Sequence, residues 1–237
     1  MKIVSISGTE GVGKDTAGAL ATAALRAEGV DARTFSFAAE GYVEVAQAFE
    51  LTVEYLQRRD TKELDQERLG LRFCRNAEFV NFMLTNAQEI TGSRMDLSTK
   101  MSPRNLMKWY LTQYRRQSEF GYDEYWIDKT HAKLKRHPDA IWFCTDTRFD
   151  AERTFLQSHD TLYVRLHKNN VDDQDLHFLA NGHESEKQWR KWHFDVHVMN
   201  QEGSQAELLK AMVDAIHCAG KGYFLTAQPS KDHAIQI

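Results

Sequence analysis

The beginning of the chain constrains its fold more than any other segment. Residues 2–7 (KIVSIS) have the apolar character of a core strand, and the glycine-rich run GTEGVG follows at residues 8–13. Lys14 comes next, and the alanine-rich residues 16–27 are expected to form a helix. A strand, a glycine-rich turn ending in lysine and a helix form the context of a phosphate-binding P-loop. Glycine permits backbone angles that a side chain forbids, so successive N–H groups can converge on phosphate oxygens at the positive end of a helix.

The loop residues are expected to share the binding of a nucleoside triphosphate. Lys14 would reach the outer phosphates, and the usual pattern places Ser or Thr directly after it. Here Asp15 stands in that place and Thr16 follows. Because carboxylate oxygen suits a hard cation, we expect Asp15 to hold Mg²⁺ directly or through water and Thr16 to bond a phosphate beside it. A glycine-rich turn that binds nothing is the alternative, which the complete context disfavours. The predicted nucleotide-binding residues are Gly8, Gly11, Val12, Gly13, Lys14, Asp15, Thr16 and, from a later turn, Asn200.

Composition and charge exclude several other classes of protein. A chain of 237 residues with a net charge of −4 fits one α/β domain with a helical insertion. The slightly negative charge argues against a nucleic-acid binder that uses its whole surface, but it allows a local basic groove. The three cysteines are far apart, so neither a disulfide framework nor a zinc site is expected, and the cytoplasm is the expected compartment. We find no signal peptide and no apolar run long enough to cross a membrane.

Strand-like and helix-like segments alternate along the chain. Strands are expected at residues 2–7, 32–37, 140–145, 161–166 and 195–199, with helices between them. The charged residues 51–88 are expected to be largely helical. This order predicts an α/β fold of the P-loop nucleotide-kinase type, a three-layer arrangement with a mostly parallel sheet and helices on both faces. One domain is expected over residues 1–227, with a helical acceptor-binding insertion at about 38–136 and a flexible tail at 228–237.

Ligands of such sheets bind beyond the carboxyl ends of the strands. The P-loop, the run Asp146-Thr147-Arg148 and the segment after Met199 all fall at that edge. Asp146 could help to hold magnesium, its waters or a phosphate acceptor, and the alternative role is to cap the next helix. Asn200 to Gly203 could line an adenine pocket or form an ordinary turn. We expect a lid segment at His183 to Glu186, and the spacing of His183, His193 and His197 fits no zinc pattern.

A small-molecule kinase also needs arginines for the acceptor phosphate and for the transferred group. Candidates on a helical segment opened by Ser102 and Pro103 are Arg104, Arg115 and Arg116. Others are Arg148 and the group Arg58, Arg59 and Lys62. Aromatic residues are interleaved with these cations and could stack a base. We expect most of them to be core residues, with one or two contacting a base, among Trp109, Tyr110, Tyr114, Tyr122, Tyr125 and Trp126.

With these motifs assembled, the chain resembles the bacteriophage deoxynucleoside monophosphate kinase family, a branch of the P-loop nucleotide kinases. The resemblance covers most of the chain in the right order. It rests on Gly8 to Thr16, Phe37-Ala38, Arg58 to Asp65, Ser102-Pro103-Arg104 with Arg115-Arg116, Tyr125-Trp126-Ile127, Asp146 to Phe149 before Glu152, His183 to Glu186, and Asn200 to Gly203.

The resemblance implies phosphorylation of a deoxynucleoside 5′-monophosphate with ATP and Mg²⁺. The catalytic residues would then be Lys14, Arg104, Arg115, Arg116, Asp146 and Arg148. The acceptor would be bound by Phe37, Arg58, Lys62, Arg104, Trp126, Asp146 and Arg148. The location would be the cytoplasm, that of the host if a phage encodes the chain. The expected binding partner is the acceptor, and no membrane is expected to be involved. Whether the chain forms a homodimer is left open.

Two other functions stay open at the level of sequence. A related group of phage kinases phosphorylates the hydroxymethyl group of 5-hydroxymethyluracil within DNA, and its motifs would look much the same. A DNA acceptor needs a basic groove that follows a backbone, which Arg104 to Arg116 and Lys129 to Arg136 could supply. The third function is an ATP-hydrolysing switch module. Such a switch needs a water-positioning residue and mobile loops, and the sequence identifies neither.

Overall fold

The chain is divided by its contacts into two compact units. The computed structural model describes residues 1–168, 187–200 and 204–218. The first unit comprises Met1–Ser36 with Lys133–Ile237, and we call it the sheet unit. The second comprises Phe37–Ala132, and we call it the helical unit.

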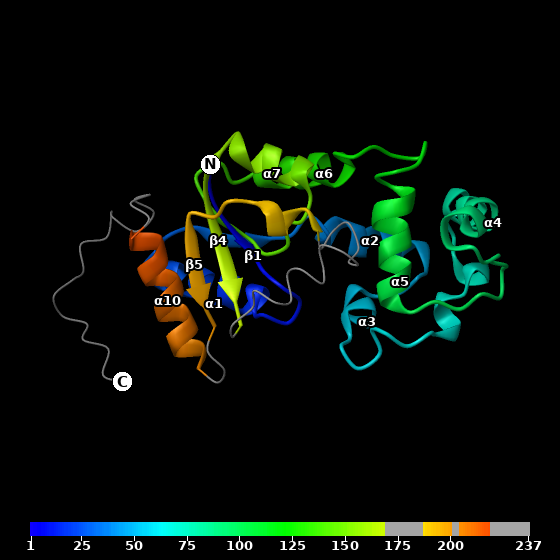
Figure 1. Cartoon of the computed structure of the whole chain (residues 1–237), viewed down its shortest axis with the longest axis horizontal. Coiled ribbons are helices and arrows are strands. Elements are labelled where there is room, and N and C mark those ends of the chain that lie inside the picture. Colours follow the sequence, from blue (N-terminus) through cyan, green and yellow to red (C-terminus); the bar gives the residue numbers. More distant parts are fainter. Residues whose placement is uncertain (169–186, 201–203, 219–237) are drawn as a thin grey trace. The chain divides into compact units, whose positions relative to one another are not determined.

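The sheet unit contains five parallel strands (Figure 1). They run in the order β2-β3-β1-β4-β5, which places β1 in the centre. All four pairings are parallel, so the carboxyl ends of the strands lie at one edge of the sheet. The predicted α/β fold class with a parallel sheet is therefore confirmed. The strands are β1 (Lys2–Ser7), β2 (Ala32–Phe35), β3 (Ile141–Cys144), β4 (Asp160–His167) and β5 (Val196–Met199).

Helices cover both faces of this sheet (Figure 1). Helices α1 (Lys14–Ala27) and α10 (Gln205–Cys218) share a buried apolar cluster with Leu162 and Val164 of β4. Successive strand residues point to opposite faces, so Thr161 and Tyr163, on either side of Leu162, turn towards α7 (Asp150–Gln157). There the Thr161 hydroxyl donates to the Leu156 carbonyl at 2.6 Å, and the Tyr163 hydroxyl donates to the Arg153 carbonyl at 3.4 Å. The result is the predicted three-layer arrangement.

The helical unit is built from short helices rather than long ones. Residues 51–88 were expected to be largely helical, and that expectation is wrong in its extent. Gly70 and Asn76 have extended backbone angles and end one helical segment before the next begins. The helices are α2 (Ala39–Ala48), α3 (Val53–Gln57), α4 (Ala77–Thr91), α5 (Pro103–Lys108) and α6 (Tyr125–Leu134), with 3₁₀ turns at Glu67–Leu69 and Leu71–Phe73 and a π-helix at Trp109–Tyr114.

Local signals fix the start of α5. The Ser102 side chain accepts a hydrogen bond from the Asn105 N–H at 3.3 Å, and Pro103 occupies the first helical position, both as predicted. The following π-helix presents Tyr110 and Tyr114 to Phe79 of α4, with ring centroids 4.8 and 5.3 Å away. Most of the aromatic residues named from the sequence are therefore core residues, as expected.

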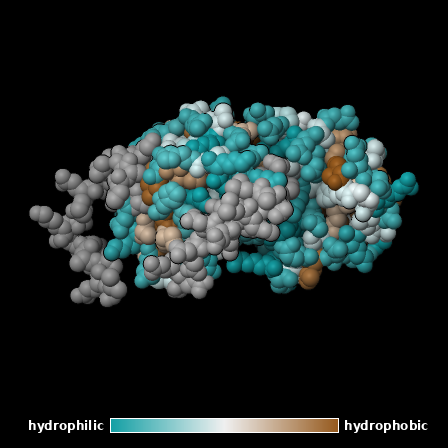
Figure 2. Space-filling view, viewed as in Figure 1, coloured by the Kyte–Doolittle hydropathy of each residue, from teal (hydrophilic) through white to brown (hydrophobic). Residues whose placement is uncertain are grey.

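Hydrophilic side chains predominate on the face drawn in Figure 2, and hydrophobic ones are scattered over it. In the described part of the chain, no helix has both the length and the apolar character that a bilayer crossing requires.

Candidate active site

The glycine-rich loop has the backbone geometry that its sequence predicts. Gly11 and Gly13 have φ angles of 75° and 96°, in the left-handed region that favours glycine. Gly13 is the N-cap of α1, so the helix begins at Lys14, two residues earlier than expected. A Cβ atom on Gly13 would lie 2.8 Å from the Asn200 side-chain nitrogen, so this position also lacks room for a side chain.

The Lys14 side chain folds back over this loop. Its ammonium donates to the carbonyl oxygens of Gly8 and Thr9 at 2.9 and 2.8 Å. These bonds hold a positive charge against the turn that, in a P-loop, receives phosphates. Bound phosphate oxygens would replace the carbonyl oxygens as acceptors of this ammonium.

Asn200, which follows the edge strand β5, holds the glycine-rich loop in place. Its side-chain amide donates to the Val12 carbonyl at 2.8 Å, and its backbone N–H donates to the His167 carbonyl at 2.8 Å. The sequence placed Asn200 in the nucleotide-binding set, and here it bonds the loop backbone and so positions the phosphate-binding turn. Residues 201–203 and the expected lid at His183 to Glu186 lie outside the described residues.

Asp15 ties the first turn of α1 to the end of β3. The Thr145 hydroxyl donates to an Asp15 carboxylate oxygen at 2.7 Å, and Asp146 is the next residue along. The oxygens of Asp15, Thr16 and Asp146 are hard ligands that fit Mg²⁺. Among the described residues no group of three or more His, Cys, Asp or Glu side chains could hold an ion. Mg²⁺ commonly keeps several waters and binds through one or two carboxylates and substrate phosphates.

The strand end that carries Asp146 and Arg148 is held by buried polar groups. The Thr147 hydroxyl bonds the Ser5 hydroxyl at 2.9 Å. The buried Glu152 carboxylate accepts from the backbone N–H groups of Arg148 and Phe149 at 2.7 and 3.1 Å. Glu152, rather than Asp146, thus satisfies these amides at the start of α7.

In the helical unit, Arg104 lies beside Lys62 and Glu63, and Arg58 has an acidic partner of its own. The Arg104 N–H donates to the Lys62 carbonyl at 3.1 Å, and its guanidinium bonds Glu63. Arg58, four residues before Lys62, pairs with Asp60 at 2.6 Å, and both side chains of this pair are exposed. These cations are accessible to an anionic acceptor that would compete with the carboxylates.

Arg115 is instead enclosed by a carboxylate and aromatic rings. Its guanidinium lies 3.3 Å from a Glu44 oxygen and 4.6 and 4.8 Å from the ring centroids of Tyr114 and Tyr125. Tyr125 also donates to Glu44, at 2.7 Å. Burial raises the pKa of Tyr110 to about 12, so this fourth neighbour keeps its proton. Arg115 therefore has several partners without a ligand, and its buried Nε–H is left without a hydrogen-bond partner.

Three other predicted acceptor residues are buried. The Arg116 side chain is 4% exposed and donates to the Asp123 carbonyl at 3.1 Å. Trp126 is fully buried, and its indole N–H donates to the Leu111 carbonyl at 3.0 Å. Phe37 is 1% exposed. Their predicted contacts with an acceptor stay predictions.

Three residues that position the site were not identified from the sequence. Thr145 orients Asp15, Glu152 holds the strand end, and Glu44 holds Arg115. A signal existed for Glu44, because it lies three residues after Gly41 and four before Ala48, two buried residues on the same face of α2. A carboxylate on a buried helix face needs a cation or several donors nearby.

No protein-family model matches the chain, and no curated protein matches it. Among solved structures, it is similar to the APS kinase of Mycobacterium tuberculosis in complex with AMPPNP and APS, with a TM-score of 0.42, 11% identity, and coverage of 91% of this chain and 97% of that one. It is also similar to a gluconokinase from Sinorhizobium meliloti 1021, with a TM-score of 0.37, 12% identity, and coverage of 95% and 98%. Both scores are below 0.5, so the function must be argued from the site itself.

Proposed function

We propose that the chain transfers the γ-phosphoryl group of ATP to a deoxynucleoside 5′-monophosphate, with Mg²⁺ as the metal ion. The observation that carries this proposal is the geometry of the loop. Gly13 caps α1 in the left-handed region, Lys14 lies against the loop, and Asp15 is oriented by Thr145 at the strand end. This arrangement suits a triphosphate and a cation better than any other ligand.

In this proposal each loop residue has a defined task. The N–H groups of the glycine-rich turn would bind phosphate oxygens, and Lys14 would bind the outer phosphates. Asp15 and Thr16 would supply oxygen ligands, and Mg²⁺ would neutralise charge on the phosphates. Asn200 would keep the turn in place through the Val12 carbonyl. Catalysis would come from positioning and charge stabilisation, which dominate phosphoryl transfer.

The acceptor would be held by cations and a carboxylate at the strand end. Asp146 and Arg148 follow β3, at the edge where ligands bind in parallel sheets. Arg58, Lys62 and Arg104 of the helical unit would bind the acceptor phosphate. Arg115 and Arg116 would act on the phosphates only if they left the partners described above.

The charge of the helical unit favours a free nucleotide over DNA as the acceptor. Residues 37–132 contain 13 Lys and Arg against 15 Asp and Glu. A surface that follows a DNA backbone needs an excess of cations, whereas one 5′-phosphate needs only two or three.

In the experiment, purified protein is incubated with Mg²⁺, γ-labelled ATP and one candidate acceptor at a time. The acceptors are each deoxynucleoside monophosphate and, separately, duplex DNA containing 5-hydroxymethyluracil. Label on a free monophosphate supports the proposal and identifies the base. Label on the DNA alone would make the chain a DNA-modifying kinase, and ATP turnover without any acceptor would favour a switch module.

Lys14→Ala tests the loop, and Lys210→Ala is its matched control, because Lys210 is an exposed lysine of the same unit. Loss of a phosphate-binding donor costs about 10²–10³ in rate. We expect Lys14→Ala to lose at least that factor while its circular dichroism spectrum stays unchanged. An active Lys14→Ala enzyme would refute the assignment.

A further inference from the structure

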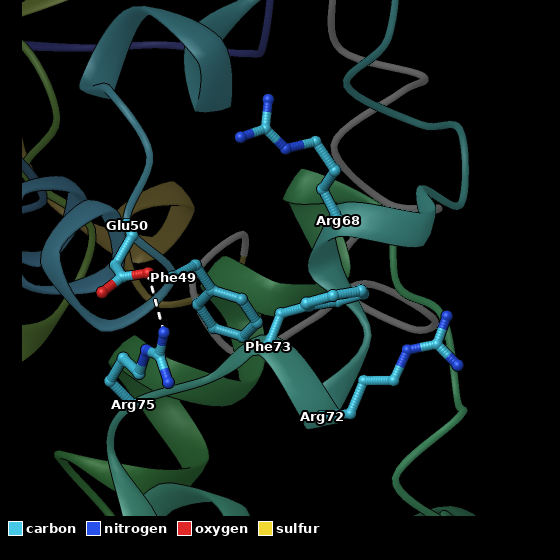
Figure 3. Close-up of a pocket in the computed structure, with 6 residues that line it drawn as sticks. All are labelled: Phe49, Glu50, Arg68, Arg72, Phe73 and Arg75. Carbon is cyan, nitrogen blue, oxygen red and sulfur yellow. Dashed lines mark hydrogen bonds and ion pairs between the residues drawn. The ribbon is translucent and has the colours of Figure 1, made fainter.

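A pocket in the helical unit is lined by residues with no role in the proposed reaction. It encloses about 270 Å³, close to the lower end of the range of about 300–1,000 Å³ for small-molecule sites. Figure 3 shows its lining residues, all of which belong to the helical unit: Phe49, Glu50, Arg68, Arg72, Phe73 and Arg75.

Two aromatic rings form the apolar part of this pocket. Figure 3 shows Phe49 and Phe73 next to each other at its centre. Phe49 is 4% exposed and belongs to the core, whereas Phe73 is 43% exposed. An accessible phenylalanine ring at a pocket offers a face on which a planar base can stack.

The charged residues around these rings carry an excess of positive charge. Three guanidinium groups face one carboxylate, that of Glu50. Among the described residues Arg68 has no acidic partner, and its guanidinium lies 5.6 Å from the Tyr55 ring centroid. In Figure 3, Arg68 and Arg75 lie on different sides of the pair of rings.

The other two arginines have partners of different strength. Arg72 pairs with Glu67 and stands over the Phe73 ring, 4.9 Å from its centroid. Arg75 pairs with Glu50 at 3.1 Å, and both side chains of this pair are more than 60% exposed. Exposed pairs contribute little to stability, so Glu50 offsets the positive charge of Arg75 only weakly.

The local backbone explains why these groups converge. Glu50 follows α2 with a φ angle of 52°, the left-handed conformation in which many helices end. The Arg75 N–H donates to the Ala48 carbonyl at 2.6 Å, which brings the chain after the 3₁₀ turn back to the end of α2. The pocket is thus fixed by backbone bonds rather than by its own ion pairs.

We propose that this pocket binds a nucleotide through its phosphate ester, with Arg68 on the phosphate, the base stacked on Phe73, and Arg75 adding positive charge from the other side of the rings. Guanidinium groups bind phosphate oxygens through two parallel N–H donors, and the ring supplies the sequence-tolerant stacking that nucleotides share. The nucleotide can be a free monophosphate or the phosphorylated end of a single strand. The site does not depend on phosphoryl transfer.

The test follows the backbone amide resonances of residues 68–75 in the ¹⁵N-labelled full chain. The probes are the four deoxynucleoside monophosphates, a 5′-phosphorylated (dT)₆, thymidine and inorganic phosphate. We expect saturable shifts with the phosphorylated nucleotides, weaker ones with phosphate, and none with thymidine. Comparing the monophosphates with (dT)₆ tells the two sources apart. Absence of saturable shifts with every nucleotide would overturn the proposal.

Two variants that change the charge of the pocket in opposite directions add to this test. Arg68→Gln should weaken binding about tenfold or more, as expected for losing a charge-assisted hydrogen bond. Glu50→Gln should strengthen it about two- to fivefold, because the pocket loses its one lining carboxylate, which repels a phosphate. Arg94→Gln removes an exposed arginine elsewhere in the same unit and should change nothing. Equal effects of Arg68→Gln and Arg94→Gln would also overturn the proposal.

The titration is repeated with Lys14→Ala, which disables the loop of the proposed kinase site. Shifts at residues 68–75 should persist with the same affinity. If the wild-type protein transfers no label in the kinase assay but these shifts remain, the proposed function is wrong and the proposal of nucleotide binding in this pocket is supported. If the shifts vanish with Lys14→Ala, they report the loop and the pocket proposal falls.

Discussion

Glu44→Ala should destabilise the helical unit by about 3 kcal/mol. The Glu44 carboxylate accepts from Tyr125 at 2.7 Å, lies 3.0 Å from the Lys129 ammonium and pairs with Arg115 at 3.3 Å. The side chains of Glu44 and Arg115 are 15% and 17% exposed. Removing one partner of a buried pair costs about 3–5 kcal/mol, because the remaining charge is left uncompensated.

Two features move the estimate to the lower end of that range. Lys129 is 46% exposed, so water can replace the carboxylate there at little cost. Arg115 keeps its contacts with the rings of Tyr114 and Tyr125, and each cation–π contact contributes about 0.5–2 kcal/mol. The Arg115 guanidinium therefore keeps part of its stabilising contacts after Glu44 is removed.

The assay is urea unfolding of the full chain, with the free energy of unfolding taken from the midpoint and the slope. Glu50→Ala is the matched control, because it removes a carboxylate from an ion pair whose side chains are 71% and 65% exposed. That control should cost at most about 1 kcal/mol. The double variant Glu44→Ala/Arg115→Met should recover part of the loss, since it removes the uncompensated charge. If Glu44→Ala costs no more than Glu50→Ala, the reasoning about this buried pair is refuted.

Four further predictions concern single side chains. Thr145→Val removes the donor to Asp15 and should lower kcat about tenfold and raise the Mg²⁺ concentration needed for half-maximal rate, measured in steady-state kinetics. Asn200→Ala removes the bond to the P-loop backbone and should weaken ATP binding about fivefold by calorimetry. Burial, together with Arg165 and His193 nearby, lowers the pKa of His197 below 6.5, so near that pH the unfolded chain binds more protons than the folded chain. The free energy of unfolding should therefore fall as the pH drops below 6.5, and it should fall less in His197→Gln. Burial raises the pKa of Cys74 to about 11, so iodoacetamide should label it at pH 8 more than about tenfold more slowly than free cysteine, as read by peptide mass spectrometry.

The sheet could be predicted because each strand carries a local signal. The run Ile141–Cys144 is buried at every position, and such continuous apolar runs are typical of central parallel strands. Its predicted and observed bounds differ by one residue at each end. The predicted start of α1 was two residues late because the left-handed Gly13 caps that helix.

The helical unit was harder to predict because distant contacts override its local pattern. The charged stretch after residue 51 lacks proline, so its composition favours a helix. In the structure the Gln66 N–H bonds the Met101 carbonyl, and the Arg72 N–H bonds the Leu97 carbonyl. These bonds satisfy backbone donors that a continuous helix would satisfy locally, and they turn the segment into short pieces.

The sequence predicts a helix after residues 140–145, but not the residue that caps it. Glu152 stands at the third helical position, where a capping box places Glu or Gln, but Phe149 occupies the cap instead of Ser, Thr, Asp or Asn. The Glu152 carboxylate alone satisfies two amides there. A search that requires both members of the box cannot find a helix start of this kind.

The arginines show why the candidate site was only partly accessible to sequence reasoning. Arg115, Arg116 and Arg68 are the same residue type on the same unit, yet one is caged by Glu44, one is buried beside Asp123, and one has no acidic partner among the described residues. What separates them is the carboxylate that each one meets in space, and Glu44 and Arg115 are separated by 71 positions. An arginine run in a sequence therefore predicts an anion site only when the carboxylates that compete for it are also placed, and that placement requires the fold.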